Sequence, residues 1–236
     1  MSAVIDVQNL QTYFHTDRGV VKAVDDISFQ IEPGHTLGVV GESGSGKSVT
    51  SLTIMRLLAA SAQVENGSIS FLGQDLVSLP ETDMRKIRGG KISMIFQEPM
   101  SSLNPVKKIG KQITEVLTKR MGMSSRPAKV RASELIDSVG IPDAEQQLCR
   151  YPMHLSGGMR QRVAIAIAIA CEPKLLIADE PTTALDVTIQ AQILDLLKEQ
   201  QKKQGIDAGN FKARNELNLE GEIVKQQELM DKAEAD

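Results

Sequence analysis

The eight residues from Gly41 to Ser48, GESGSGKS, are the part of this sequence that most directly implies chemistry. They fit the pattern G-x-x-x-x-G-K-[ST], in which backbone N–H groups surround phosphate oxygens, the lysine bridges terminal oxygens and the hydroxyl holds Mg²⁺. A glycine-rich turn alone has no such role, but this one follows an apolar strand pattern and precedes a helical one. The stretch therefore predicts a nucleotide phosphate site, whose expected contact residues are Gly41, Gly44, Gly46, Lys47, Ser48 and Val49.

A second candidate site is LLIADE, residues 175–180, where a buried strand pattern ends in two adjacent carboxylates. Burying two carboxylates is costly unless a metal or substrate charge compensates them. We expect Asp179 to hold Mg²⁺ through water and Glu180 to act as general base, because hydrolysis of a γ-phosphate needs an oriented water near the metal. The alternative, an acidic junction between a strand and a loop, becomes weak once the phosphate site is accepted.

Composition excludes several classes of protein. The 236 residues are 41% hydrophobic, enough for one large domain or a domain with a subdomain. A formal charge of −3 and the lack of tryptophan argue against a nucleic-acid surface. Cys149 and Cys171 form no paired motif, the N-terminus does not resemble a secretory signal, and the longest apolar run, 163–171, is too short to cross a bilayer. Any membrane association is therefore expected to go through a partner.

The elements that must position these residues follow from periodicity. Strand patterns with turn signals fill residues 4–40, and further strands are predicted at 67–76 and 91–96. Helical patterns dominate residues 99–155. The segment around 163–170 alternates like a strand, yet its alanines favour a helix, so the pattern leaves both open. An amphipathic helix is predicted over 188–204, and the chain from Gly205 onward is polar, with eight acidic and four basic side chains.

The segment LSGGM, residues 155–159, resembles the signature motif of the ATP-binding cassette (ABC) ATPases. Other motifs follow in the family's order: Gln97 resembles the Q-loop glutamine, and TALD, ending at Asp186, resembles the D-loop. Tyr13 or Phe14 stands where the family stacks adenine. The whole set is most similar to ATPase subunits of bacterial dipeptide, oligopeptide and glutathione importers.

The resemblance implies an α/β fold of the P-loop NTPase class: an ABC-type ATPase core with an antiparallel β subdomain and a helical subdomain, C-terminally incomplete. Residues 1–97 and 156–204 are expected to form the core with its β subdomain, and residues 98–155 the helical subdomain. Residues 205–236 are left as an atypical polar tail. By the same resemblance, the ambiguous segment around 163–170 is expected to be a helix.

The resemblance also implies ATP and Mg²⁺ as cofactors. Glu180, Lys47 and Gln97 are the expected catalytic residues, and Ser48, Gln97 and Asp179 the expected metal ligands. Independently of the family, Ser156, Gly157 and Gly158 offer a hydroxyl and open amides at a predicted helix N-terminus, which suits an anion. In the family this loop meets the γ-phosphate held by the opposite subunit.

The partners implied are the membrane permease subunits, received near residues 98–110, and a second cassette, either a copy of the chain or a paired ATPase subunit. An extracytoplasmic solute-binding protein acts indirectly, and no nucleic acid is expected. The implied location is the cytoplasmic face of the inner (plasma) membrane, peripherally bound.

The sequence departs from the family after residue 204, where members continue with an apolar strand that ends in a switch histidine. None of His15, His35 and His154 stands at that position. We therefore expect the central sheet to end uncovered beside 175–180 and the tail to be a solvated helix or disordered. Three alternatives stay open: an importer ATPase, a cassette that binds but barely hydrolyses nucleotide and needs a complete partner, and, least favoured, a soluble ABC protein acting on ribosomes or DNA.

Overall fold

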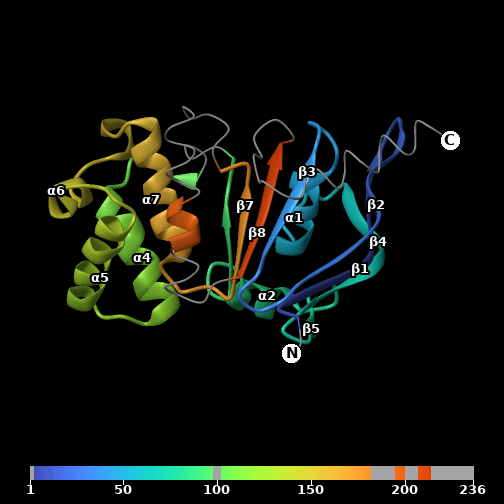
Figure 1. Ribbon diagram of the computed structural model, residues 1–236, viewed down its shortest axis with the longest axis horizontal. Coiled ribbons are helices and arrows are strands. Elements are labelled where there is room, and N and C mark those ends of the chain that lie inside the picture. The colour runs from blue at the N-terminus through green and yellow to red at the C-terminus, as the bar shows by residue number, and fades with distance from the viewer. Residues whose placement is uncertain (1–2, 98–101, 182–194, 200–206, 214–236) are drawn as a thin grey trace.

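The computed structural model describes residues 3–97, 102–181, 195–199 and 207–213, the last segment by its backbone. In Figure 1 the strands gather on one side and helices α4 to α7 on the other. The strands are β1 (Ile5–Thr16), β2 (Gly19–Ile31), β3 (Thr36–Gly41), β4 (Ala62–Phe71), β5 (Gln74–Asp75), β6 (Ile92–Ile95), β7 (Leu175–Asp179) and β8 (Asp207–Ala213). The helices are α1 (Lys47–Met55), α2 (Glu81–Ile87), α4 (Ile109–Met121), α5 (Ser125–Ser138), α6 (Ala144–Leu148) and α7 (Gly157–Ile169), with a 3₁₀ turn at Pro152–His154. Among these described residues, no helix combines the length and the apolar character needed to cross a bilayer.

An antiparallel sheet with strand order β2-β1-β4-β5 forms the β subdomain. A two-residue turn joins β1 to β2, and Thr16 pairs with Gly19 across it. Ile5 and Val7 of β1 are fully buried, since alternate side chains of this sheet face the core. An irregularity in the register between Val7 and Leu10 brings Leu10, three positions further on, into the core as well. The strands predicted at the start of the chain are confirmed, although β1 continues to Thr16.

A parallel sheet with order β3-β8-β7-β6 forms the centre of the molecule. Every residue of β6 and β7 is buried, as expected for parallel strands covered on both faces. The carboxyl ends of parallel strands share one edge of the sheet. Gly41 at the end of β3, Asp179 at the end of β7 and Gln97 after β6 are therefore brought to the same edge.

The expectation that this sheet ends uncovered beside residues 175–180 is wrong. β7 pairs with β6 on one side and with β8 on the other, and β8 pairs with β3 in turn. The segment Asp207–Ala213 is a strand rather than the predicted solvated helix or disordered tail. The sequence DAGNFKA has no apolar periodicity that would predict a strand. Hydrogen bonds to two neighbouring strands place this segment in the sheet.

The parallel sheet separates two hydrophobic clusters. Leu175 and Ile177 of β7 join the cluster that contains α1 and the β subdomain, whereas Leu176 and Ala178 join the cluster of the helices. Since alternate side chains of a strand face opposite ways, α1 and α7 cover opposite faces of the sheet. The Gly41–Ser48 loop, which leads into α1, and the LSGGM motif, at the start of α7, therefore begin helices on opposite faces of the sheet.

Helices α4, α5 and α6 pack together beside α7, on the left in Figure 1. Gly110 lets α4 approach α6 closely, because a Cβ there would lie 2.9 Å from the Leu148 carbonyl oxygen. The helices predicted within residues 99–155 are confirmed, and residues 157–169 form a helix as the family resemblance implied, against their alternating pattern. Of the helix predicted over 188–204, the described residues 195–199 are helical, and Leu196 is buried in the helical cluster.

Candidate nucleotide and magnesium site

Residues 41–48, called the phosphate loop below, connect β3 to α1. Gly46 caps α1 with a φ of 91°, a left-handed conformation that glycine adopts without strain. A Cβ at Gly46 would also lie 2.3 Å from the Ala23 carbonyl oxygen of β2, so the loop is pressed against the β subdomain. Gly44 and Val49, also predicted as contacts, lie in the loop and in the first turn of α1. The N-terminal amides of α1 are thus directed to one place, which suits an anion.

Lys47 is almost fully buried, with 5% of its surface exposed. Its ammonium group donates hydrogen bonds to the carbonyl oxygens of Gly41 and Glu42, both at 2.8 Å. A third, longer contact of 3.4 Å reaches the Ser45 hydroxyl. The positive charge is therefore held inside the phosphate loop, where the sequence predicted that it would meet phosphate oxygens.

Ser48 and Asp179, two of the predicted metal ligands, meet although 131 positions separate them in the chain. The Ser48 hydroxyl donates to Asp179 Oδ1 at 2.9 Å. Burial raises the pKa of Asp179 above the ordinary aspartate value and the charge of Glu180 raises it further, while the Ser48 hydrogen bond and Lys47 oppose this shift. The carboxylate is therefore costly to keep charged unless a cation approaches it.

Gln97 and Glu180 also meet at this edge. The Gln97 side-chain nitrogen donates to Glu180 Oε2 at 2.8 Å. Glu180 adopts a φ of 45°, which is strained for a residue with a side chain and is typical of functional positions. The strain is a consequence of turning the chain sharply after β7, which keeps the carboxylate at the edge of the sheet.

The donor set at this edge fits Mg²⁺. A hydroxyl from Ser48, a carboxylate from Asp179 and the amide oxygen of Gln97 are hard oxygen donors, the kind that this ion prefers. The hydrogen bond from the Gln97 nitrogen to Glu180 leaves the amide oxygen as the group that can face a cation. A cation there would also compensate the charge of Asp179 that burial disfavours.

The signature residues lie at the predicted helix N-terminus. Ser156 is the N-cap of α7, and its hydroxyl accepts a hydrogen bond from the Met159 backbone N–H at 3.3 Å. Gly157 and Gly158 form the first turn of the helix. Because α7 and α1 cover opposite faces of the parallel sheet, this N-terminus does not belong to the same cradle as the phosphate loop.

Tyr13 and Phe14, the two aromatic candidates for stacking on the adenine base, differ in their surroundings. The Tyr13 hydroxyl donates to Asp25 Oδ1 at 2.5 Å, and the Lys22 ammonium lies 5.1 Å from the centre of the Tyr13 ring. Phe14 lies on the same face of β1 as Thr12, whose hydroxyl is 3.2 Å from the Thr53 hydroxyl of α1. Sequence reasoning missed Lys22, which the register of β1 and β2 pairs with Tyr13, and Asp25, which accepts the hydrogen bond from the Tyr13 hydroxyl.

Asp186, the predicted D-loop residue, lies outside the described residues. The remaining site residues fall into two groups: those of the phosphate loop and the ends of β6 and β7, which the structure brings together, and the signature residues, which it places elsewhere.

A β subdomain, a parallel sheet with a phosphate loop and two carboxylates at one edge, and a separate helical subdomain define a P-loop ATPase cassette of the ABC type. The chain belongs to the ABC transporter family, which its residues 24–183 match.

Two relatives illustrate the similarity. The oligopeptide transport ATP-binding protein AppD of Bacillus subtilis is 57% identical over 200 residues, which cover 84% of this chain and 61% of the relative. A putative peptide import ATP-binding protein of Brucella melitensis is 51% identical over 233 residues, covering 96% of this chain and 68% of the relative. The second alignment covers too much of the chain to stop at residue 204, so the similarity to this relative continues past the point where the resemblance was expected to end. The chain spans about three fifths of the length of AppD.

Solved structures agree with this assignment of the fold. A dimeric ATP-binding cassette in a post-hydrolysis state, bound to ADP and Pi, superposes with a TM-score of 0.78 at 27% identity, covering 88% of this chain and 87% of the other. A cassette of a CbiONQ transporter complex from Clostridium perfringens gives a TM-score of 0.74 at 25% identity, covering 90% of this chain and 79% of the other.

Proposed function

We propose that this chain is the ATP-binding subunit of a bacterial ABC importer, which binds and hydrolyses Mg-ATP to drive uptake of peptides or related small solutes. One observation carries the catalytic part of the proposal: the Ser48 hydroxyl bonds to Asp179 at 2.9 Å. That contact joins the phosphate loop to the acidic end of β7, so phosphate and metal ligands occupy one place. The relatives are oligopeptide, dipeptide and peptide transport ATP-binding proteins by name, which supports the class of solute.

Each residue then has a distinct task. The amides of the phosphate loop and the Lys47 ammonium bind the phosphates. Ser48, Asp179 and Gln97 would hold Mg²⁺, and a bound Mg²⁺ would neutralise charge on the phosphoryl oxygens. Glu180 accepts a proton from the attacking water as general base. The hydrogen bond from Gln97 orients the Glu180 carboxylate. The same glutamine thus serves both the metal ligands and the general base.

The adenine base is expected to stack on an aromatic side chain of β1. Tyr13 and Phe14 are both candidates, and the contacts favour Phe14. The Tyr13 ring already lies under Lys22 and its hydroxyl is bound to Asp25, whereas Phe14 shares the face of Thr12, which contacts the helix that follows the phosphate loop.

The working unit is proposed to contain two cassettes, either two copies of this chain or this chain and a paired ATPase subunit. The support is that α7 begins on the face of the sheet opposite to α1. Ser156, Gly157 and Gly158 would then complete the phosphate site of the other cassette, as the family resemblance implied. Asp186 is proposed to lie at the same interface.

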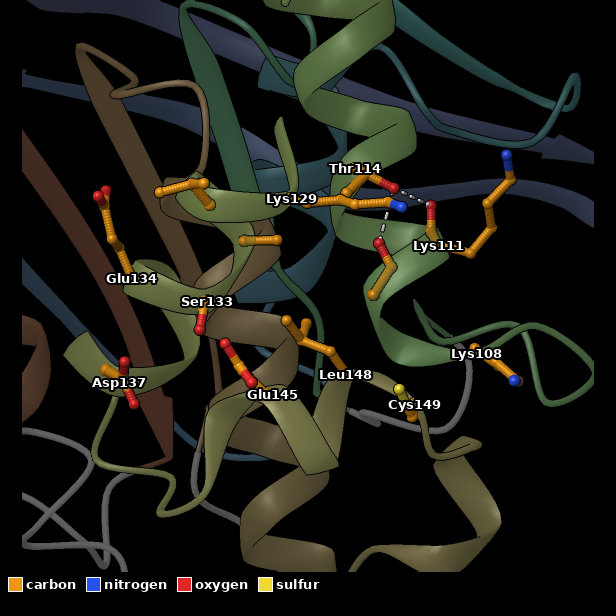
Figure 2. Close-up of a pocket in the computed structure, with 13 residues that line it drawn as sticks. Lys108, Lys111, Thr114, Lys129, Ser133, Glu134, Asp137, Glu145, Leu148 and Cys149 are labelled. Carbon is orange, nitrogen blue, oxygen red and sulfur yellow. Dashed lines mark hydrogen bonds between the residues drawn. The ribbon is translucent and has the colours of Figure 1, made fainter. Parts of the chain in front are cut away.

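The helical subdomain offers a surface for a membrane permease subunit. Figure 2 shows a cavity between α4, α5 and α6, with Thr114 of α4 on one side and Ser133 and Glu145 on the other. Its volume is about 670 Å³, and it includes Lys108 and Gly110, which belong to the surface expected near residues 98–110. Exposed Val130 and half-buried Leu148 give the cavity an apolar surface, which an amphipathic helix of the permease can cover.

The remaining partners and the location follow from this assembly. The permease places the chain peripherally at the cytoplasmic face of the inner membrane. A solute-binding protein outside the membrane would deliver the solute to the permease and would act on this chain indirectly.

The direct test is equilibrium binding of Mg-ATP to the purified chain, by calorimetry, compared with the variant Lys47→Ala. We expect the variant to lose measurable binding, because it removes the ammonium that meets the phosphates. Lys86→Ala is the matched control, since Lys86 is exposed on α2 and pairs with Asp83. Unchanged affinity in Lys47→Ala would contradict the assignment of the site. Phosphate release measured on the same samples separates an active ATPase from a cassette that binds but barely hydrolyses.

A further inference from the structure

Gln161, in the second turn of α7, carries a buried amide without a hydrogen bond. The residue is 1% exposed, and neither the oxygen nor the nitrogen of its amide has a partner among the residues that the structure describes. An amide that is removed from water and left unpaired destabilises the state of the protein in which this happens. A state that gives the amide a partner is favoured in turn.

The side of α7 that carries Gln161 is the side turned to the parallel sheet. Residues three and four positions apart share one side of a helix, so Gln161 shares its side with Ala164 and Ala168. On another side, Arg162 donates to the carbonyl oxygen of the residue that caps the end of α5. On a third, Ile167 lines a cavity with residues of α4. The side with Gln161 is left for the sheet, where α7 contacts β6.

Gln161 also lies at the level where the strands end. In Figure 1 the chain runs down α7 and back up β7, so α7 begins near the edge at which β7 ends. The rise per residue of a helix puts Gln161 about 14 Å from Ala170, and that of a strand puts Asp179 about 13 Å from Leu175. The Gln161 amide is therefore placed beside the carboxyl end of β7.

The same side of the sheet carries Glu180. Asp179 is turned to the opposite side, where a hydroxyl of α1 donates to it, whereas Ala178 belongs to the hydrophobic cluster that contains α7. The alternation of a strand assigns Glu180 to the side of Ala178. Gln97, which donates to Glu180, comes two positions after Ile95 of β6, another member of that cluster.

A buried amide without a partner and the carboxylate of the proposed general base thus lie on one side of the sheet and at one level. From this placement we propose that Gln161 is a positioning residue for Glu180: its amide nitrogen donates to the carboxylate when Mg-ATP occupies the site. Together with Gln97, it holds the base toward the attacking water. The inference rests on the proposed function, because it gives Gln161 a part in the reaction assigned to Glu180.

The contact would also connect two motifs of the chain. α7 begins with the signature residues, which are proposed to serve a second cassette, and Gln161 follows them by one turn. A hydrogen bond from Gln161 to Glu180 would therefore tie the signature helix to the general base of its own cassette.

The test compares Gln161→Met, which keeps an unbranched side chain and removes the amide, with Gln147→Met as the matched control. Gln147 of α6 is 6% exposed, and its amide oxygen also has no partner in the described part of the chain. However, α6 packs against α4 and α5 rather than against the strand ends. Three quantities are measured on the whole chain: the melting temperature without nucleotide, the affinity for Mg-ATP by calorimetry, and phosphate release.

Without nucleotide, Gln161→Met should melt about 2–4 °C above the unmodified chain, because an apolar group replaces an unpaired amide. The same variant should bind Mg-ATP about tenfold more weakly or worse, as loss of one hydrogen bond to a charged group does, and should release phosphate more slowly. Gln147→Met should bind Mg-ATP as the unmodified chain does.

A double-mutant cycle with Glu180→Ala identifies the partner of the amide. In the Glu180→Ala background, we expect Gln161→Met to change the affinity for Mg-ATP by less than about twofold, because the acceptor is already absent. The same tenfold loss in both backgrounds would show that the amide acts through another group, and the inference would be wrong.

Other results would also overturn the inference while leaving the proposed function in place. If Gln161→Met melts below the unmodified chain without nucleotide, the amide already has a partner there, such as a buried water. If Gln161→Met binds Mg-ATP with unchanged affinity, or if Gln147→Met weakens binding equally, Gln161 has no specific role at the site. If the unmodified chain does not bind Mg-ATP, the proposed function itself fails and the inference fails with it.

Discussion

Asp179 carries its charge at a position where that charge is costly unless a cation lies nearby. The side chain is 5% exposed, and burial is the main cause of its raised pKa. The hydrogen bond from Ser48 offsets part of the cost, but the adjacent Glu180 adds to it. A buried carboxylate beside a second carboxylate stabilises a bound cation rather than the fold. Such a loss of stability is common at functional sites.

We therefore predict that Asp179→Asn stabilises the protein in the absence of nucleotide and metal. The amide oxygen can still accept from Ser48, and the buried charge is gone, so we expect a gain on the order of 1 kcal/mol, or roughly 2–4 °C in melting temperature. The gain should be present above the pKa of Asp179 and should vanish as the pH falls below it, because the protonated aspartic acid is also neutral. Thermal melts between pH 4 and pH 8, followed by circular dichroism, measure this.

Asp75→Asn is the control of opposite sign. Burial alone would raise the pKa of Asp75, but hydrogen bonds from the Ser78 hydroxyl and from the backbone of Val77 and Ser78 outweigh it and lower the pKa. The charged form is thus favoured by the fold, and its removal should lower the melting temperature. If Asp179→Asn melted below the unmodified chain at pH 7, burial would not be the dominant effect at Asp179.

At the scale of elements, the C-terminus of α1 is held by hydrogen bonds from Arg88, the residue that caps the C-terminus of α2. Arg88 donates to the carbonyl oxygens of Met55 at 2.6 Å and Arg56 at 3.1 Å, which lie at the C-terminus of α1. It also holds both carboxylate oxygens of Glu81, at 2.7 and 3.0 Å. Since the last carbonyls of a helix lack partners within it, a guanidinium group there satisfies groups that would otherwise be buried without hydrogen bonds.

We predict that Arg88→Met destabilises the protein by about 1–3 kcal/mol, because it leaves partly buried carbonyls without donors. Arg131→Met is a matched control: Arg131 pairs with the carboxylates of Glu134 and Glu172, which are more than half exposed. Surface ion pairs contribute little, so that variant should lose about 1 kcal/mol or less. Urea unfolding of both variants measures the difference, and equal losses would show that the contacts with α1 carry no special weight.

The elements with strong apolar periodicity could be predicted from the sequence, and those fixed by distant partners could not. β3 and α1 are confirmed around the phosphate loop, since a strand, a glycine loop and a helix follow each other directly. α7 needed the family resemblance, because its alternating residues pack on several sides and hide the helical period. β8 was missed because its seven residues, DAGNFKA, contain no apolar run and gain their structure from hydrogen bonds to β3 and β7. Lys22 and Asp25 were missed because the pairing of β1 with β2 brings them to Tyr13.

At the scale of the whole molecule, the parallel sheet divides the functional motifs between its two faces. α1 and the phosphate loop belong with the β subdomain, and α7 belongs with the helical subdomain. Figure 1 shows the same division, with β6 and β7 between the two groups. The helix N-terminus capped by Ser156 belongs to the helix that packs on the face of the sheet opposite to α1, which is compatible with a role toward a second cassette.

This division predicts that two cassettes associate when ATP is bound and separate when it is hydrolysed. Glu180→Gln removes the general base, and we expect phosphate release to fall by about 10²-fold or more and a dimer to accumulate at saturating Mg-ATP. Light scattering with size-exclusion chromatography measures the mass, for the variant alone and mixed with a paired ATPase subunit.

Adding Ser156→Asp to Glu180→Gln should prevent the dimer, because a carboxylate at the start of α7 repels the phosphates of the other cassette. Ser125→Asp in the same background is the control: Ser125 is exposed in the first turn of α5, where an acidic residue favours the helix, so the dimer should persist. If Glu180→Gln stays monomeric at saturating ATP in both settings, the signature residues do not act across such an interface. If the Ser156→Asp variant dimerises as readily as the Ser125→Asp variant, the dimer exists but the start of α7 does not contact phosphate in it. The first outcome would contradict the dimer itself, and the second would contradict only the role of Ser156 in it.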